Sequence, residues 1–283
     1  MKKFSIIIMG ALTLVLLMPL TAFGATVTYP VTGGNIVFDI DTGIVTSCDS
    51  DVTVAVIPEK INGSTVTGIG NRAFANRKKL EKITIPNSVT SIGMGAFMGC
   101  GKLTDINIPK GITSLETSLF FACTGLTSVT IPNSVTSIGG SAFHGCISLT
   151  NVTIPNSIMS IGSDAFSSSG LKSVSIPYGV TNIGDMAFYS CADLSSVTIP
   201  SSVTNIGSYA FSICSSLTTV TIPGSVTSMG KGAFSECKKL ANVKIGYGLT
   251  SIAESAFSLC PNLTSITIPS ASLVLANQRS EAV

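Results

Sequence analysis

The stretch that decides the fold is IGGSAFHGCISLTNVTIPNSIMS, residues 138–160. In its first half, Ala142, Cys146 and Leu149 stand at i, i+4 and i+7. This spacing places three small or apolar side chains on one face of a helix. The first half therefore predicts a short helix with one buried face.

The second half of the stretch has a different period. Val152 and Ile154 alternate with polar residues, which is the pattern of a half-buried strand. Pro155 follows directly, and proline belongs at the end of a strand because it has no N–H to donate to the ladder. The second half predicts a short strand that ends at the proline.

The whole stretch recurs along the chain in a fixed register. Nine units cover residues 69 to 269, and the interval is 23 residues except for one step of 22, which a deletion within Ser167–Gly170 explains. The repeated phenylalanine marks each unit, at Phe74, Phe97, Phe120, Phe143, Phe166, Phe188, Phe211, Phe234 and Phe257. One unit cannot bury its inward side chains alone, whereas stacked units form a continuous core. The predicted fold is an α/β repeat with a parallel sheet.

The repeat I-G-x-x-A-F-x-x-C-x-x-L-x-x-V-x-I-P resembles that of the BspA-like bacterial leucine-rich-repeat proteins. The resemblance implies a right-handed solenoid with a curved parallel β-sheet on its concave side and short helices or turns on its convex side. It also implies a secreted or cell-surface protein that binds other proteins. Four positions depart from the repeat without disturbing its core pattern, namely Glu116, Leu119, Gly246 and Ala253.

The parts of the chain outside the repeats suggest a simple organisation. We expect a signal peptide at 1–24, a β-rich N-terminal cap at 25–51, the solenoid at 52–269 and a C-terminal tail at 270–283. The tail is set apart because Ser272 occupies the place of an inward valine.

The first residues have the features of an export signal. Lys2 and Lys3 precede the apolar stretch from Ile6 to Leu20, and small residues follow at Ala22 and Gly24. This order is typical of a signal peptide that is cleaved after Gly24. The expected location is therefore secreted or cell surface, with no membrane insertion after cleavage.

Composition narrows the possible functions. The chain of 283 residues is 45% hydrophobic and 11% charged, with a formal net charge of +2. The apolar content argues against disorder. The small charge gives no electrostatic footprint for a nucleic acid, so no such partner is expected.

Seven of the eight cysteines occupy one repeat position, three residues after the phenylalanine. Stacked coils would bring such cysteines close enough for disulfides, which are common in exported proteins. On the predicted helix this position instead faces the core, where cysteine acts as a small hydrophobic residue. Pairing would also leave one of the three consecutive cysteines, Cys100, Cys123 and Cys146, without a partner. We expect buried free thiols and no zinc site.

Few residues suit catalysis. His144 is the only histidine, and it follows the repeat phenylalanine at a position expected to be exposed and variable on the convex side, as in Ser167, Ser212, Ser235 and Ser258. Asp41-Thr42-Gly43 is similar to an aspartic-protease motif, but the required second copy is absent, so a turn explains it better. The cap aspartates Asp39, Asp41, Asp49 and Asp51 favour a solvated loop over a weak calcium site. We therefore expect no catalytic residue, cofactor or metal.

The outward positions of the predicted sheet form the candidate ligand surface. They are rich in hydroxyl groups and poor in charge, a composition that also suits β-propensity and solubility alone. Two tyrosines just after the strands are the nearest aromatic candidates. The candidate ligand-binding residues are Thr84, Thr130, Thr153, Ser175, Thr198, Thr221, Thr267, Tyr178 and Tyr247.

Three functions fit this sequence. The first is a binding module, similar to an adhesin, for an extracellular protein or glycoprotein. The second is a structural component of the extracellular space or envelope without a dedicated ligand. The third is ice binding by regularly spaced Thr-x-Thr pairs, which Lys82, Asp105 and Lys244 interrupt.

Overall fold

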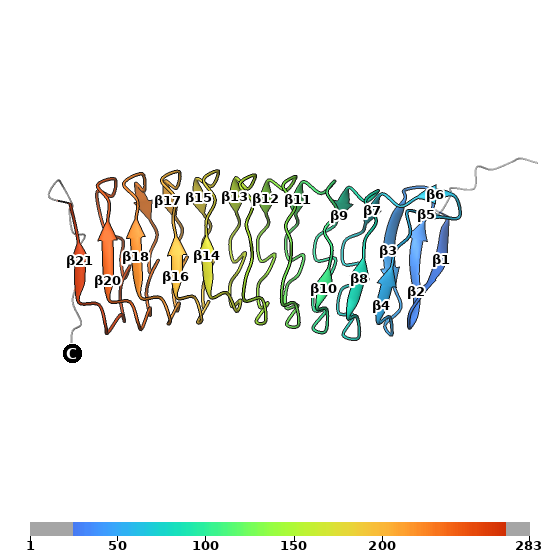
Figure 1. The fold of residues 1–283 in the computed structure, drawn as a ribbon, viewed down its shortest axis with the longest axis horizontal. Coiled ribbons are helices and arrows are strands. Elements are labelled where there is room, and N and C mark those ends of the chain that lie inside the picture. Colours follow the sequence, from blue (N-terminus) through green and yellow to red (C-terminus); the bar gives the residue numbers. More distant parts are fainter. Residues whose placement is uncertain (1–24, 270–283) are drawn as a thin grey trace, which may run out of the picture.

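The computed structural model describes residues 25–269. The predicted signal peptide and tail lie outside these residues. The described chain winds into coils that lie side by side along the long axis of the molecule, from the N-terminal coils in blue to the last coil in red (Figure 1). Each coil has three faces: one with the strands that precede the proline, one with a second set of strands, and one made of turns.

The first face, called the proline face, carries the strands predicted from the V-x-I-P pattern. Its strands pair in parallel and in register, as Val174 does with Val197 and Val220 with Val243. The strands are β4 (Val54–Val56), β8 (Lys82–Thr84), β10 (Asp105–Ile106), β14 (Ser173–Ser175), β16 (Ser196–Thr198), β18 (Thr219–Ile222), β20 (Asn242–Ile245) and β21 (Ser265–Thr267).

The second face carries shorter parallel strands that the sequence analysis did not predict. Each contains an inward Ile, Leu or Met after a polar residue, as in Ser137 and Ile138, or, in one case, after the buried Gly68. The strands are β7 (Gly68–Ile69), β9 (Ser91–Ile92), β11 (Ser114–Leu115), β12 (Ser137–Ile138), β13 (Ser160–Ile161), β15 (Asn182–Ile183), β17 (Asn205–Ile206) and β19 (Ser228–Met229).

Three longer strands cover the N-terminal end of the coils within the segment predicted as a cap. These are β1 (Thr26–Val31), β2 (Gly34–Asp39) and β3 (Ile44–Cys48). They pair antiparallel with one another, and β3 then pairs in parallel with β7, so they continue the second face. A small antiparallel hairpin lies beside them, with β5 (Lys60–Ile61) and β6 (Ser64–Thr65).

The third face corrects the prediction of short helices, because the described residues contain turns there and no helix. Two positions in each coil have positive φ, such as 55° at Ser141 and 71° at Gly145, which a helix cannot contain. The N–H of Phe143 donates to the carbonyl of Ala165 in the next coil, at 2.7 Å. A helix would direct this N–H to its own coil. The α/β description is therefore wrong, and the fold is a β-solenoid.

The repeat glycine allows neighbouring coils to approach closely. A Cβ atom on Gly139 would lie 2.7 Å from the carbonyl oxygen of Leu115 in the preceding coil. In the coil of 22 residues, a Cβ on Gly170 would overlap the carbonyl oxygen of Ile147. Both contacts are too short for a side chain, so these two coils need glycine here, whereas the coils with Glu116 and Ala253 accommodate a side chain at the position of the repeat glycine.

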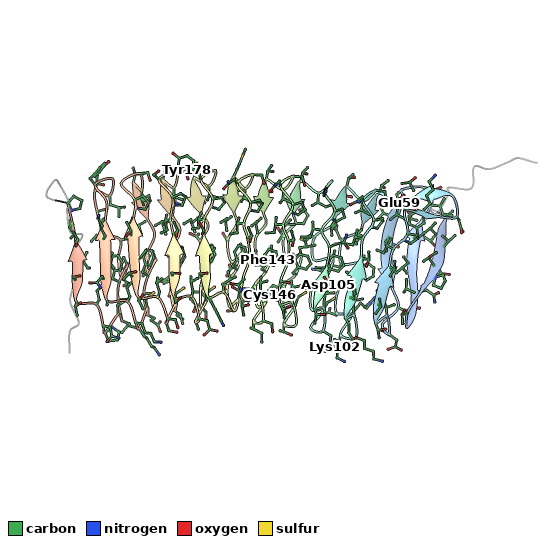
Figure 2. All side chains as sticks on the ribbon, in the orientation of Figure 1. Glu59, Lys102, Asp105, Phe143, Cys146 and Tyr178 are labelled. Atoms are coloured by element: carbon green, nitrogen blue, oxygen red, sulfur yellow. The ribbon has the colours of Figure 1, made fainter. Side chains whose placement is uncertain are left out.

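The core runs through all the coils as stacked layers. The repeat phenylalanines stack face to face, with 5.3 Å between the ring centroids of Phe120 and Phe143 and 5.1 Å between those of Phe143 and Phe166. Phe143 and Cys146 are fully buried, and Figure 2 shows both in the interior of the coils. The predicted inward residues thus form the core.

Candidate ligand-binding surface

The proline face presents the predicted threonine and serine side chains to solvent. Strand alternation places them outward, because their neighbours Ile83, Val174 and Val220 point into the core. All seven are exposed: Thr84, Thr130, Thr153, Ser175, Thr198, Thr221 and Thr267. Thr130 and Thr153 pair directly as an isolated parallel bridge between adjacent coils.

Among residues 25–269, the hydroxyl groups of these seven residues find no hydrogen-bond partner, unlike those of other threonines in the coils. At the corner of the coils, the Oγ1 of Thr136 donates to the carbonyl of Thr113, and Thr204 donates in the same way to Thr181, both at 3.2 Å. Within the part of the chain that the structure describes, the hydroxyls of the seven residues make no such bond. They therefore have their full hydrogen-bonding capacity for a ligand.

Among the outward strand positions, charged groups lie toward the two ends of this surface, and Lys110, which follows a repeat proline, borders its middle. Lys82 and Asp105 form an exposed ion pair with an N–O distance of 3.1 Å, and Lys244 lies on β20 near the other end. Between them the outward residues are neutral. A ligand on this part would be bound by many neutral hydrogen bonds rather than by charge.

The middle of the proline face is hollowed where its regular pairing stops between β10 and β14. One hollow of about 560 Å³ lies around Thr153 and Asn156, and one of about 440 Å³ next to it includes Ser175. A third, of about 450 Å³, lies around Asn133 and Lys110. These sizes lie within the range typical of small-molecule sites.

Two of the amide side chains in these hollows, those of Asn133 and Asn156, were missed by the sequence analysis. Asn133 and Asn156 each follow a repeat proline, and Asn151 lies on the outward side of the strand segment. Carboxamides donate and accept hydrogen bonds together, so they complement the hydroxyls beside them. The recurring Pro-Asn-Ser triplet was the available signal.

The two tyrosines are exposed but lie apart from the hollows. The exposed fractions of Tyr178 and Tyr247 are 69% and 80%. Both follow the strands, and Figure 2 shows Tyr178 at the edge of the coils near the second face. The ring of Tyr247 lies over Gly224, where a Cβ would be 3.0 Å from the ring. Neither tyrosine lines the hollows of the proline face.

The position after the repeat phenylalanine is less exposed than predicted. Ser167, Ser212 and Ser235 are buried. The ring of His144 stacks on that of Phe121 with 4.7 Å between centroids. Side chains at this position stack between the turns of neighbouring coils, which is why they are covered. The prediction of a variable, exposed convex position is wrong for these residues.

The polar groups of the N-terminal segment stabilise its turns. The carboxylate of Asp39 accepts the N–H groups of Asp41 and Thr42, as expected of a turn, and Gly43 has a φ of 73°. The carboxylate of Asp49 accepts two bonds from Asn35. Within residues 25–269, no cluster of three or more His, Cys, Asp or Glu side chains is suited to hold a metal.

The cysteines form a ladder through the interior, and all eight are free thiols. The Sγ of Cys123 donates to the carbonyl of Phe97 at 3.0 Å, and the same contact recurs along the coils. Burial raises the pKa of Cys100 and of Cys146 to about 12 and that of Cys191 to about 11. These thiols stay protonated at neutral pH and are poor nucleophiles.

The repeat architecture agrees with the family models of known proteins. The model of the BspA type leucine rich repeat region matches residues 55–172 and 159–278, in 6 copies. The chain belongs to this family. None of the curated proteins matches the chain at a significant level.

Solved structures of bacterial leucine-rich-repeat proteins share the fold of this BspA-type chain. A leucine rich cell surface protein of Faecalibacterium prausnitzii is 27% identical with a TM-score of 0.54, covering 90% of this chain and 86% of its own. A leucine-rich repeat protein of Bacteroides ovatus is 27% identical with a TM-score of 0.59, covering 86% and 74%. A leucine rich repeat protein of T. pallidum is 30% identical with a TM-score of 0.57, covering 75% and 90%.

The structure also bears on membrane spans. Between Ala25 and Pro269, no helix has the length and apolar character needed to cross a membrane.

Proposed function

We propose that this BspA-type chain is a secreted or cell-surface protein that binds an extracellular protein or glycoprotein through its proline face. The observation that carries the proposal is the row of free, exposed hydroxyls from Thr130 to Thr221, beside the hollows that contain Asn133 and Asn156. Hydroxyls and carboxamides suit neutral polar ligands, such as peptide backbones and glycans.

The proposal includes the location and the shape of the molecule. Cleavage of residues 1–24 releases the solenoid outside the cytoplasm, and no membrane insertion follows. Right-handed winding and a curvature that makes the proline face concave would bring its side chains toward one ligand. The leucine rich relative from F. prausnitzii is described as a cell surface protein, which supports this location.

The chemistry of the surface determines how a ligand is held. A neutral hydrogen bond contributes about 1 kcal/mol, and the proline face has no aromatic or arginine anchor among its outward residues. Affinity must therefore come from many contacts spread over several coils. We expect single substitutions to have small effects and combined substitutions to have large ones. The family and the fold point to binding rather than catalysis.

A binding panel tests the proposal. The protein, immobilised through its C-terminus, is presented with purified extracellular-matrix proteins and with their deglycosylated forms. We expect saturable binding of at least one of them that falls gradually with salt, since few charges take part. If no member of the panel binds above an immobilised unrelated protein, the alternative of a structural component without a dedicated ligand replaces the proposal.

A further inference from the structure

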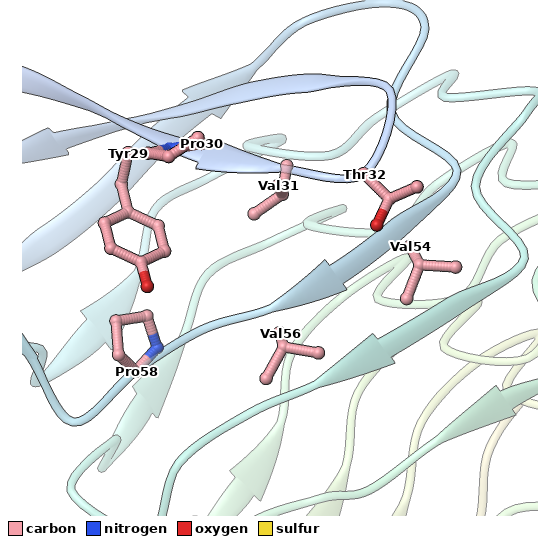
Figure 3. Close-up of a pocket in the computed structure, with 7 residues that line it drawn as sticks. All are labelled: Tyr29, Pro30, Val31, Thr32, Val54, Val56 and Pro58. Carbon is pink, nitrogen blue, oxygen red and sulfur yellow. The ribbon is translucent and has the colours of Figure 1, made fainter.

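A separate hollow with an uncharged lining lies at the N-terminal end of the proline face. It has a volume of about 430 Å³ and opens between the end of β1 and the first proline-face strand, β4 (Figure 3). Its lining contains no charged side chain and consists of Tyr29, Pro30, Val31, Thr32, Val54, Val56 and Pro58.

The hollow opens because the pairing of β1 with β4 stops after one bridge. Thr32 and Val54 pair antiparallel, with the N–H of Thr32 donating to the oxygen of Val54 at 3.1 Å. Continued antiparallel pairing would place Pro30 opposite Val56. Proline has no N–H to donate, so the ladder cannot continue there. The two strands diverge instead, and Figure 3 shows Tyr29 and Pro58 at the far end of the gap.

The backbone of Val56 consequently faces the gap. On its other edge, β4 pairs in parallel with β8, and the N–H of Ile57 donates to the oxygen of Thr84 at 3.0 Å. In a parallel ladder, alternate residues of a strand bond to the same neighbour. Ile57 therefore bonds to β8, whereas the N–H and C=O of Val54 and Val56 point to the opposite edge. Thr32 pairs with Val54 and leaves the edge at Val56 open.

The outward side chains of β4 differ from those of the other proline-face strands. In the strand positions two and four before the proline, the repeats carry mainly Thr, Ser and Asn, but here both are valine. The exposed fraction of Val56 is 60%. An unpaired strand edge beside an exposed valine is a template for another strand.

We propose that this hollow binds an extended, uncharged peptide segment of a partner protein, which adds to β4 as a strand and pairs with the backbone of Val56. Backbone hydrogen bonds would hold such a segment, and its alternate side chains would lie against Val31, Val56 and Pro58. An uncharged segment fits because the lining has no partner for a buried charge. The site is distinct from the hydroxyl surface of the central coils and does not depend on the function proposed for it.

The probe is a peptide with the sequence that pairs along this sheet in the chain itself. Fluorescently labelled acetyl-Ser-Val-Thr-Ile-Pro-amide, the sequence of residues 196–200, is titrated with the protein and followed by anisotropy. Val56→Asp places a charge in the hollow and should weaken binding about tenfold or more. Thr28→Asp is the matched control, on an exposed residue of β1 outside the lining, and should bind as the original protein does.

Methylated peptides test strand addition without altering the protein. One peptide is N-methylated at Ser and Thr and the other at Val and Ile, so each loses the donors on one edge. Strand addition predicts that one of the two binds about fivefold more weakly, since it loses the N–H that bonds to the C=O of Val56, while the other retains its affinity.

Three results would overturn this proposal. The first is the absence of saturable binding by the peptide. The second is equal binding of both methylated peptides, which would mean that the peptide does not pair as a strand. The third is a concentration-dependent dimer of the protein alone that Val56→Asp dissociates, because the hollow would then be occupied by a second copy of this chain.

Discussion

The Sγ atom of Cys146 lies 3.1 Å from the carbonyl oxygen of Phe120 in the preceding coil. This oxygen also accepts a hydrogen bond from the N–H of Cys123 in its own coil. The thiol of Cys146 therefore adds a second hydrogen bond, which joins two neighbouring coils. The cysteine therefore fills a small apolar position and satisfies a buried carbonyl at the same time. Ser169 takes the place of the ladder cysteine in its coil. Its Oγ lies 3.3 Å from the Sγ of Cys191, so a polar contact is kept there.

Alkylation should distinguish the interior thiols from the one at the C-terminal end. Cys146 is fully buried, whereas Cys260 is only partly buried in the last coil that the structure describes. In native protein without reductant, we expect iodoacetamide to label Cys260 first and Cys146 only after unfolding. Mass spectrometry of the digested protein measures both sites. Cross-links between ladder cysteines in the same experiment would contradict the free-thiol assignment.

The buried thiols should make stability depend on alkaline pH. Cys146 has an ordinary pKa of 9.0, which burial raises to about 12 in the folded state. Between these values the folded state keeps a proton that the unfolded state has lost. The contribution of the protonated thiol to the free energy of unfolding is fully present at pH values below the lower pKa. Above the lower pKa, the free energy of unfolding falls by about 1.4 kcal/mol per pH unit for each such thiol.

The variant Cys146→Ala isolates this contribution, since lysines and tyrosines titrate equally in both proteins. We expect the stability difference between the protein and the variant to shrink from about pH 8 to about pH 10.5 in urea unfolding with reductant. A difference that stays constant over this range would mean that the thiol is not protected from ionisation.

The phenylalanine stack should determine much of the stability of the central coils. Phe143 is fully buried between the rings of Phe120 and Phe166. Phe143→Ala should lower the free energy of unfolding by about 3–5 kcal/mol, the usual range for a core phenylalanine. The loss can be confined to neighbouring coils, because the stability of a solenoid is nearly a sum of nearest-neighbour terms.

Urea unfolding, together with hydrogen exchange resolved by coil, measures this loss. His144→Ala is a useful comparison, since that ring is partly exposed and stacks only on Phe121. A loss of under about 0.5 kcal/mol for Phe143→Ala, which is typical of surface substitutions, would show that the register of the coils is wrong.

The sequence predicted the inward residues well because their period repeats nine times. Phe143, Cys146 and Ile154 are buried as expected. The second face was missed because its strands, such as Ser137–Ile138, are two residues long and too short to show alternation. The helix prediction failed because the spacing of Ala142 and Cys146 is also compatible with two consecutive turns, closed by residues with positive φ.

The candidate surface was predictable only in part. Alternation alone placed Thr130 and Thr153 outward, and the structure agrees. The hollows beside them depend on where the pairing between coils stops, and the Pro-Asn-Ser triplets that contain Asn133 and Asn156 do not by themselves indicate where that is. The N-terminal hollow at Val56 depends on Pro30, which lies far from Val56 in the sequence.

Replacement of one face at a time tests most directly the claim that the proline face binds the ligand. Thr130, Thr153, Thr198 and Thr221 are all changed to Lys in one variant. The matched variant changes four exposed residues of the second face to Lys, namely Ser91, Ser160, Asn182 and Ser228. Circular-dichroism melting confirms that both variants are folded.

The measurement is the affinity of each variant for the matrix protein that binds in the panel described above. Four lysines on the proline face remove free hydroxyls and place like charges in the path of a neutral ligand, so we expect this variant to lose binding. The second-face variant should bind within about twofold of the original protein, a difference well below that of one hydrogen bond. If the second-face variant loses binding and the proline-face variant retains it, the proline face is not the ligand surface.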